Sequence, residues 1–126
     1  MRKKILVTGA SGYLAAWIVR ELLAKGYIVH GTVRTLSDRE KLQHLFRLQH
    51  QFPNQLKLFT ADLLVPYSFD DAMSGCSMVI HTASPYFLEK PENFQEQLLL
   101  PAVDGTLNVL TSVERTREVT RVIITS

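Results

Sequence analysis

The sequence has a single cysteine, no long apolar run and almost no excess of either charge. Cys76 cannot close a disulfide within the chain by itself, so we expect a reducing compartment and a cytoplasmic protein. No apolar run approaches the ~20 residues that cross a bilayer, so we expect no membrane partner. Fourteen Lys and Arg against twelve Asp and Glu give a net charge of only +2. That excess is too small to predict a nucleic-acid partner.

The length of 126 residues suits one domain and is too short for two. The chain is 46% hydrophobic, 9% aromatic and 21% charged, as is typical of globular domains rather than disordered or fibrous ones. It contains no internal repeat, low-complexity tract or linker. Residues 1–126 are therefore expected to form a single domain.

Short apolar runs rich in β-branched residues alternate with helical patterns along the whole chain. The expected strands are residues 4–8, 27–33, 56–60, 78–82 and 121–126. The expected helices are residues 11–25, 37–50, 68–75 and 92–116. Parallel neighbours need a long, right-handed crossover, which this alternation provides. The pattern therefore predicts an α/β fold of Rossmann type, a doubly wound parallel sheet of five strands with helices on both faces, in three layers.

Local signals mark the ends of the helices and their buried faces. Ser37 or Asp38 is expected to cap the second helix, and Ser68 the third. Pro101 removes a backbone donor and is expected to kink the long helix. The first helix is expected to bury Leu14, Trp17, Ile18 and Leu22.

A glycine-rich turn joins the first strand to the first helix. Gly9 permits a tight turn, Gly12 lets the backbone approach a pyrophosphate, and Ala15 takes the third small position, where helix and strand pack together. Such a turn at a strand-to-helix junction indicates dinucleotide binding, although small residues alone would also permit a sharp turn. The beginning of the helix offers unpaired N–H groups to an anion. The expected donors are Ser11, Tyr13 and Leu14.

The second predicted strand is followed by an arginine. In this fold an acidic residue here binds the ribose 2′-hydroxyl, whereas an arginine accommodates a 2′-phosphate. Arg34 is cationic, and residues 27–36 contain no Asp or Glu. Lys41 is expected to add a second cation, with Arg39 as the competing candidate. A solvated charge at a strand end is the alternative for Arg34. The pattern predicts NADP(H) rather than NAD(H) as the cofactor.

Two further strand ends are expected to contact the cofactor. Asp62 follows the third strand, where its carboxylate is expected to accept from the adenine amine beside the Leu63 backbone. A carboxylate that caps the next turn is the alternative. Thr82, Ala83 and Ser84 follow the fourth strand, at the edge where open α/β sheets bind ligands. Their small side chains would let the cofactor lie against the backbone.

These residues resemble the extended short-chain dehydrogenase/reductase family, within the NAD-dependent epimerase/dehydratase superfamily, and most closely its dihydroflavonol reductase and cinnamoyl-CoA reductase branch. The resemblance covers the whole chain in the family's order. It implies a domain that binds NADP(H) and takes part in hydride transfer between a small carbonyl compound and its alcohol. The stretches that carry it are residues 7–15, 33–34, 61–63, 81–85, 101–110 and 122–126.

The same resemblance places the catalytic residues outside the chain. In the family a catalytic serine follows the Thr-Ser pair after the fifth strand, and a Tyr-x-x-x-Lys pair comes later, so all three are expected beyond residue 126. Thr125 and Ser126 are expected to approach the nicotinamide. The chain is therefore expected to be the N-terminal part of a longer enzyme, able to bind nucleotide but catalytically incomplete. Residues 86–90 also read Tyr-x-x-x-Lys, but the prolines on both sides oppose the helical turn that this pair requires.

Several other polar or small residues are expected to have structural roles. His81 is expected to be a hydrogen-bonded core histidine, since no cluster of His, Cys and carboxylates has the spacing of metal ligands. Cys76 is expected to be a packed thiol. Asp104 and Asn108 are expected on an exposed face of the long helix, and Gly105 is expected to let that helix approach its neighbours. The long helix is also a candidate surface for a homo-oligomer.

Two other functions fit the same sequence. A nucleotide-sugar epimerase or dehydratase of the same superfamily would retain NAD, and it usually has an acidic residue where Arg34 stands. A module that senses NADP or binds a partner would use the fold without chemistry. The preferred hypothesis is the cofactor-binding part of an NADP(H)-dependent reductase.

Overall fold

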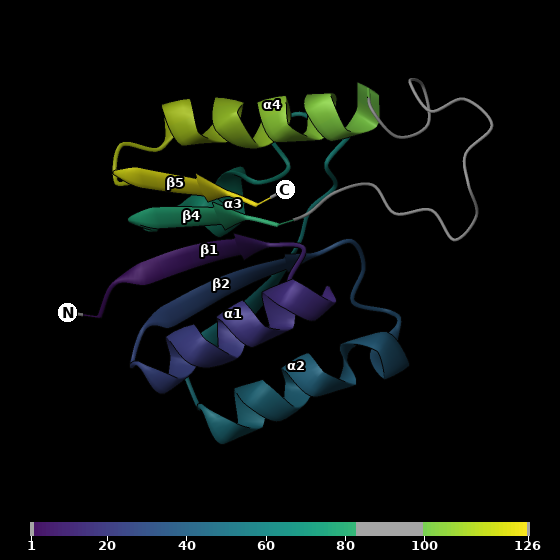
Figure 1. The fold of residues 1–126 in the computed structure, drawn as a ribbon, viewed down its shortest axis with the longest axis vertical. Coiled ribbons are helices and arrows are strands. Elements are labelled where there is room, and N and C mark those ends of the chain that lie inside the picture. Colours follow the sequence, from purple (N-terminus) through teal and green to yellow (C-terminus); the bar gives the residue numbers. More distant parts are fainter. Residues whose placement is uncertain (1, 83–99, 126) are drawn as a thin grey trace.

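The computed structural model describes residues 2–82 and 100–125, which form one parallel sheet flanked by helices (Figure 1). The elements, in chain order, are β1 (Lys4–Thr8), α1 (Tyr13–Ala24), β2 (Ile28–Val33), α2 (Arg39–Gln51), β3 (Leu56–Thr60), α3 (Asp70–Met73), β4 (Met78–His81), α4 (Leu100–Arg115) and β5 (Arg121–Ile124). The strand order is β3-β2-β1-β4-β5, and every neighbouring pair is parallel. This order confirms the predicted doubly wound sheet of Rossmann type.

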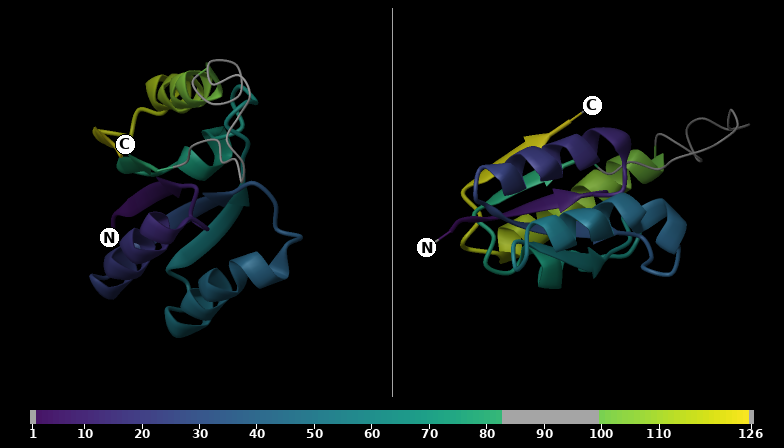
Figure 2. Two further views of the ribbon diagram at one scale, coloured as in Figure 1. Left: turned by 45° about the vertical axis from the view of Figure 1, so that its right-hand side comes forward. Right: turned by 90° about the horizontal axis from the view of Figure 1, so that it is seen from below.

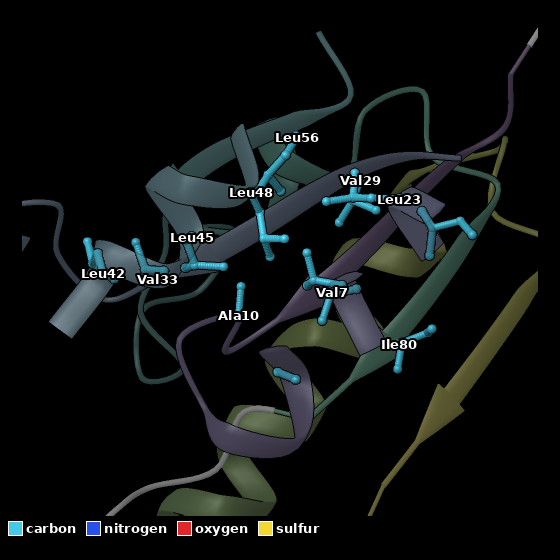
Figure 3. Close-up of a cluster of buried hydrophobic side chains, with 13 residues drawn as sticks. Val7, Ala10, Leu23, Val29, Val33, Leu42, Leu45, Leu48, Leu56 and Ile80 are labelled. Carbon is cyan, nitrogen blue, oxygen red and sulfur yellow. The ribbon is translucent and has the colours of Figure 1, made fainter. Parts of the chain in front are cut away.

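Alternate residues of the central strand pack on opposite faces of the sheet. Ile5 and Val7 belong to the cluster beneath α1 and α2 (Figure 3), whereas Leu6 belongs to the cluster beneath α3 and α4. This alternation is that of a strand covered on both faces. Figure 2 shows α1 and α2 on one side of the sheet and α4 on the other. The three predicted layers are therefore present.

The helix α1 turns a different face to the sheet from the predicted one. Trp17 is 50% exposed and Leu14 is 53% exposed, so the prediction that both are buried was wrong. Ile18 and Leu22 do pack, partly buried, against the core. The face of α1 that packs against the sheet consists of residues four apart, and Trp17, the largest side chain of the helix, lies outside this face. Trp17 instead lies under the Arg20 guanidinium, 5.7 Å from the ring centroid. The residues of α1 that are fully buried are Ala15, Val19 and Leu23.

The beginnings of two helices show different outcomes for the predicted caps. Asp38 caps α2, because its Oδ1 accepts a 3.2 Å hydrogen bond from the Lys41 N–H. Ser68 does not cap α3, and the prediction that it does was wrong. Its hydroxyl donates to the Asp62 carbonyl oxygen at 2.8 Å and accepts from the Asp62 N–H at 3.1 Å. Ser68 therefore holds the turn after β3 rather than the helix that follows.

Several predictions fall outside the described residues. They concern Ala83 and Ser84, the loop at 86–90, the part of the long helix before Leu100, and Ser126. The kink expected at Pro101 depends on that part of the helix and is likewise untested. Of the helices that the structure describes, none is both long enough and apolar enough to span a bilayer.

Candidate nucleotide-binding site

The turn between β1 and α1 has the geometry that its glycines predict. Gly9 adopts a φ of +64°, in the left-handed region that favours glycine. Gly12 has an ordinary φ of −70°, but a Cβ there would lie only 3.3 Å from the Gly9 carbonyl oxygen. That oxygen accepts a 3.0 Å hydrogen bond from the Gly12 N–H, which closes the turn. Gly12 is also the N-cap of α1, so no capping side chain covers the first turn of the helix.

The backbone amides of this turn fall into two groups. One group bonds within the protein and consists of Gly9, Ala10 and Gly12. The other group has no acceptor among the residues at 2–82 and 100–125 and consists of Ser11, Tyr13 and Leu14. The second group is the one predicted to bind phosphate, and it lies at the positive end of the α1 dipole. The first turn of α1 contains no acidic residue that would compete with an anion.

The carboxyl end of β2 packs directly against the turn. The Ala10 N–H donates to the Thr32 carbonyl oxygen at 2.8 Å, and the Gly9 N–H donates to Thr32 Oγ1 at 3.3 Å. A Cβ on Gly31 would come within 2.9 Å of the Ala10 methyl carbon, so only glycine allows this close approach without a shift. Arg34, which is exposed, follows Thr32 by two residues. The glycine turn and the arginine therefore lie at the same edge of the sheet.

The two candidates for a second cation have different surroundings. The Arg39 guanidinium lies 5.9 Å from the centroid of the Phe46 ring, on α2. Lys41 is exposed in the first turn of the same helix, and its backbone N–H bonds to the Asp38 carboxylate. The cation–π contact engages Arg39 on α2, and Lys41 as the companion of Arg34 stays a prediction.

The turn after β3 is held from within and by α4. Asp62 Oδ1 accepts from the Leu64 N–H at 2.9 Å, which is the turn-capping role that the sequence left open as the alternative. The Leu63 carbonyl oxygen accepts from Asn108 Nδ2 at 2.6 Å. Asn108 is therefore half-buried and bonded within the protein, so the prediction of an exposed position was wrong for Asn108, whereas Asp104 is exposed as predicted. The helix approaches so closely because Gly105 has no side chain: a Cβ there would lie 2.9 Å from Leu63 Cβ.

A histidine at the end of β4 connects this strand to three neighbouring segments. His81 is 3% exposed, with Nδ1 2.7 Å from Thr8 Oγ1 and Nε2 3.3 Å from Thr106 Oγ1. Its carbonyl oxygen accepts from the Thr125 N–H at 3.1 Å. The Thr82 N–H donates to Thr8 Oγ1 at 3.0 Å. The carboxyl ends of β1, β4 and β5 are thereby tied to one another and to α4.

The environment of His81 keeps the imidazole neutral. Burial lowers the pKa of His81 below its ordinary value of 6.5. A neutral imidazole donates through one ring nitrogen and accepts through the other, which suits one hydroxyl on each side. The prediction of a hydrogen-bonded core histidine is confirmed. Within the part of the chain that the structure describes, no group of three or more His, Cys, Asp or Glu side chains is arranged to hold a metal ion.

The cysteine lies in the core beside a second buried histidine. Cys76 Sγ is 3.5 Å from His30 Nδ1 and 3.4 Å from the Ala72 carbonyl oxygen. Burial raises the pKa of Cys76 to about 12, so the thiol stays protonated at neutral pH. The predicted packed thiol is confirmed.

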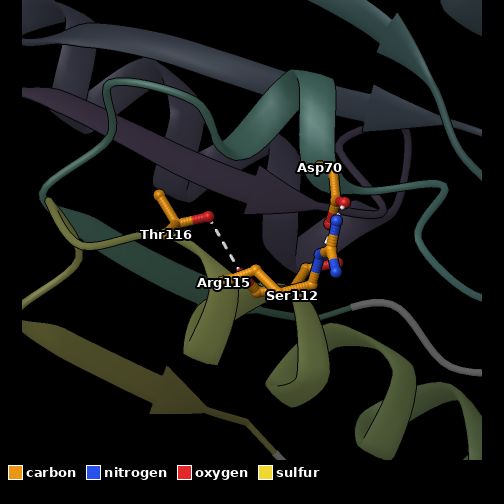
Figure 4. Close-up of polar contacts among 4 residues, drawn as sticks. All are labelled: Asp70, Ser112, Arg115 and Thr116. Atoms are coloured by element: carbon orange, nitrogen blue, oxygen red, sulfur yellow. Dashed lines mark hydrogen bonds and ion pairs between the residues drawn. The ribbon is translucent and has the colours of Figure 1, made fainter.

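An ion pair joins α3 to α4 on the face of the sheet away from α1. Arg115 Nε lies 3.1 Å from Asp70 Oδ2 (Figure 4), and the guanidinium is 4.7 Å from the centroid of the Tyr67 ring. Both partners are partly exposed, so the pair is expected to contribute only about 0–1 kcal/mol to stability. Together with the Asn108 bond, these contacts fix α4 against the segment that follows β3.

Known proteins share this architecture and its sequence motifs. The sequence model of the NAD dependent epimerase/dehydratase family matches residues 5–126. The chain belongs to this family. Among its reductases, tetraketide alpha-pyrone reductase 1 of Arabidopsis thaliana is 48% identical over 123 residues, which are 98% of this chain and 37% of that protein. Cinnamoyl-CoA reductase CAD2 of Medicago truncatula is 45% identical over 122 residues, 97% of this chain and 37% of that protein. The chain thus spans little more than a third of these relatives.

Solved structures agree with this assignment to the epimerase/dehydratase family. The structure of Gre2 from Candida albicans in complex with NADPH superposes with a TM-score of 0.84 at 35% sequence identity. The superposition covers 98% of this chain and 37% of the Gre2 chain. The resemblance to reductases of this family is therefore confirmed by both sequence and fold.

Gly31, Thr32 and Thr106 belong to the surroundings of this site, although no pattern in the sequence predicted them there. Thr32 is 23 residues from Gly9, and Thr106 is 25 residues from His81, so no local spacing rule connects them. One signal was available: a glycine inside an apolar strand often marks a close backbone approach. Gly31 is such a glycine.

Proposed function

We propose that this chain is the NADP(H)-binding part of a reductase that transfers a hydride to the carbonyl group of a small organic substrate. The observation that carries the proposal is the position of Arg34. This residue directly follows β2, two residues after Thr32, which holds the glycine turn. The names of the two relatives support a reductase, and the NADPH in the Gre2 structure supports the cofactor. A single buried thiol supports a cytoplasmic location.

The glycine turn fits a pyrophosphate. The N–H groups of Ser11, Tyr13 and Leu14, which have no acceptor among the described residues, supply the donors, and Gly12 places no side chain at the start of the helix. Bound NADPH would supply the hydride, and the task of these residues is to hold and orient it. We assign the pyrophosphate to these three amides.

The 2′-phosphate is assigned to Arg34 and Lys41. A guanidinium can donate two parallel hydrogen bonds to a phosphate, and Lys41 adds a second positive charge at the start of α2. The adenine is assigned to the turn at Asp62 and Leu63. Asp62 Oδ1 already accepts from the Leu64 N–H, so the second carboxylate oxygen is the acceptor proposed for the adenine amine.

The nicotinamide end is assigned to the edge of the sheet around His81. Thr82 and Thr125 lie there, bonded to Thr8 and to the His81 carbonyl oxygen respectively. Ala83, Ser84 and Ser126 are assigned to the same end from the sequence alone. Proton transfer to the substrate is assigned to the family's Ser and Tyr-x-x-x-Lys, which the resemblance places after residue 126.

The test compares NADPH with NADH on the 126-residue chain by calorimetric titration. Arg34→Asp should weaken NADPH binding by about ten- to a hundredfold, because charge-assisted hydrogen bonds are lost and a carboxylate repels the phosphate. NADH, which has no 2′-phosphate, should lose less than about threefold. Raising the salt concentration should weaken NADPH more than NADH, since the contact is exposed.

The matched control is Arg47→Asp, which makes the same change of charge at an exposed position on α2. It should leave the preference for NADPH over NADH unchanged. Equal losses of NADPH and NADH in Arg34→Asp would contradict the assignment of the 2′-phosphate. An unaltered chain that binds neither nucleotide would contradict the proposed function as a whole.

A further inference from the structure

Thr32 grips the glycine turn with both its side chain and its backbone. Its Oγ1 accepts from the Gly9 N–H at 3.3 Å, and its carbonyl oxygen accepts from the Ala10 N–H at 2.8 Å. Thr32 is 2% exposed, so it makes these bonds beneath the turn and does not itself face a ligand. Ala10 points into the core beside Val7 and Leu45 (Figure 3), which anchors the turn from the same side.

We propose that Thr32 is a positioning residue for the pyrophosphate of NADP(H), and that its hydroxyl orients the turn whose remaining amides, those of Ser11, Tyr13 and Leu14, bind the phosphates. This inference rests on the proposed function and deepens it. Two consecutive peptide N–H groups, those of Gly9 and Ala10, are drawn inward by one residue. The Gly9 carbonyl oxygen accepts from the Gly12 N–H, and the amides of Ser11, Tyr13 and Leu14 are left without an acceptor among the described residues.

The hydroxyl matters because Gly9 is the most adaptable residue of the turn. Its φ is +64°, and a glycine can adopt this and several other backbone conformations at similar energy. Without an acceptor at Thr32 Oγ1, the part-buried Gly9 N–H loses its partner, and rotation of that peptide toward water becomes favourable. The turn would then sample several orientations, and each phosphate would meet its donors for a smaller fraction of the time.

The two proposed phosphate sites lie on different segments, so loss of the Thr32 hydroxyl should affect them differently. Arg34 directly follows β2, two residues after Thr32, so the proposed 2′-phosphate site lies on the segment after the strand, while the pyrophosphate site is on the turn that Thr32 holds. Loss of the hydroxyl should therefore weaken ligands that carry a pyrophosphate. It should spare a ligand that carries only adenosine and a 2′-phosphate.

The experiment titrates the 126-residue chain with NADPH and with adenosine 2′-monophosphate. Thr32→Val keeps the shape and strand preference of the residue and removes only the hydroxyl. It should weaken NADPH about five- to tenfold, the effect of one hydrogen bond, and change adenosine 2′-monophosphate less than about twofold. Thr32→Ser, which restores a hydroxyl, should bring NADPH back to within about twofold of the unaltered chain. Thr60→Val, at an exposed position on the neighbouring strand β3, is the matched control and should change neither ligand.

The outcomes separate this inference from the function on which it rests. If the unaltered chain binds both ligands and Thr32→Val behaves like Thr60→Val, the inference is overturned and the proposed function stands. Equal weakening of both ligands in Thr32→Val would show a general loss of structure and would also overturn it. If the unaltered chain binds neither ligand, both proposals fail together.

A measurement on the unaltered chain covers the case in which Thr32→Val does not fold. Amide hydrogen exchange followed by NMR should show the Gly9 and Ala10 protons protected relative to those of Ser11, Tyr13 and Leu14. Added NADPH should slow the exchange of the second set far more than that of the first. Equal exchange of all five protons in the free chain would overturn the inference.

Discussion

The side-chain amide of Asn108 donates a 2.6 Å hydrogen bond to the carbonyl oxygen of Leu63, across 45 residues of sequence. The bond joins the middle of α4 to the turn that follows β3, beside the position where Gly105 lets the helix touch Leu63. The turn proposed to receive the adenine is thus held in place from the opposite side by a helix.

Replacement of Asn108 by Ala should lower the free energy of unfolding by about 1–3 kcal/mol, because the half-buried Leu63 carbonyl oxygen loses its donor. Asn108→Asp keeps the shape but places a carboxylate oxygen against that carbonyl. It should lower the free energy of unfolding at neutral pH by more than Asn108→Ala does. Urea unfolding followed by circular dichroism measures both. Thr111→Val is the control on the same helix: its hydroxyl is exposed and donates to the Leu107 carbonyl oxygen one turn back. Equal losses for Asn108→Ala and Thr111→Val would show that the contact with Leu63 contributes nothing.

The two buried histidines should make the chain less stable as the pH falls below about 6.5. Burial lowers the pKa of both His30 and His81 below 6.5 in the folded state. Below the unfolded pKa the unfolded chain therefore binds more protons than the folded one, and stability decreases with acidification until the folded pKa is reached. Above pH 6.5 this loss of stability is absent, because the two rings are then neutral in the unfolded chain as well.

Urea unfolding at about pH 7.5 and about pH 5.5 tests this dependence. The double variant His30→Gln, His81→Gln should be less stable at both pH values but should change less between them. The exposed histidine His50 provides the control, since His50→Gln should leave the dependence on pH unchanged. If the stability of the double variant changes between the two pH values as much as that of the unaltered chain, the pH dependence does not come from these two rings.

The Cys76 thiol should react with a disulfide reagent only when the chain unfolds. Burial raises its pKa to about 12, so both access and the thiolate form are lacking in the folded state. Reaction with Ellman's reagent at neutral pH should be slow in buffer and complete within the mixing time in concentrated urea. The rate in buffer then reports the opening of the core beneath α3. Rapid reaction without denaturant would show that the thiol is accessible in the native state.

The secondary structure could be predicted where the signal was local. The five strands fall where short apolar runs predict them, and the glycine turn falls at the predicted junction. The cap at Asp38 was one of two adjacent candidates, and it is a contact within four residues. Each of these depends on the backbone preferences of neighbouring residues, which a single sequence carries in full.

The failed predictions depended on neighbours that come from elsewhere in the chain. Trp17 satisfies a helical period, but the face of α1 that meets the sheet is decided by the sheet, against which Ala15, Val19 and Leu23 pack. Asn108 lies on a helix with polar neighbours, but the turn at Leu63 packs against it, so that it is half-buried and bonded within the protein. Ser68 is of a residue type that often caps helices, but its hydroxyl bonds to the backbone of Asp62 instead.

The amino-acid sequence by itself determined the order of strands and helices, the position of the phosphate-binding turn and the charge at the end of β2, because each follows from residues within one or two turns of one another. Only the tertiary structure decided which amides of that turn find an acceptor in another element. The acceptors of the Gly9 and Ala10 N–H groups belong to Thr32, on a strand that reaches the turn only after the sheet has assembled.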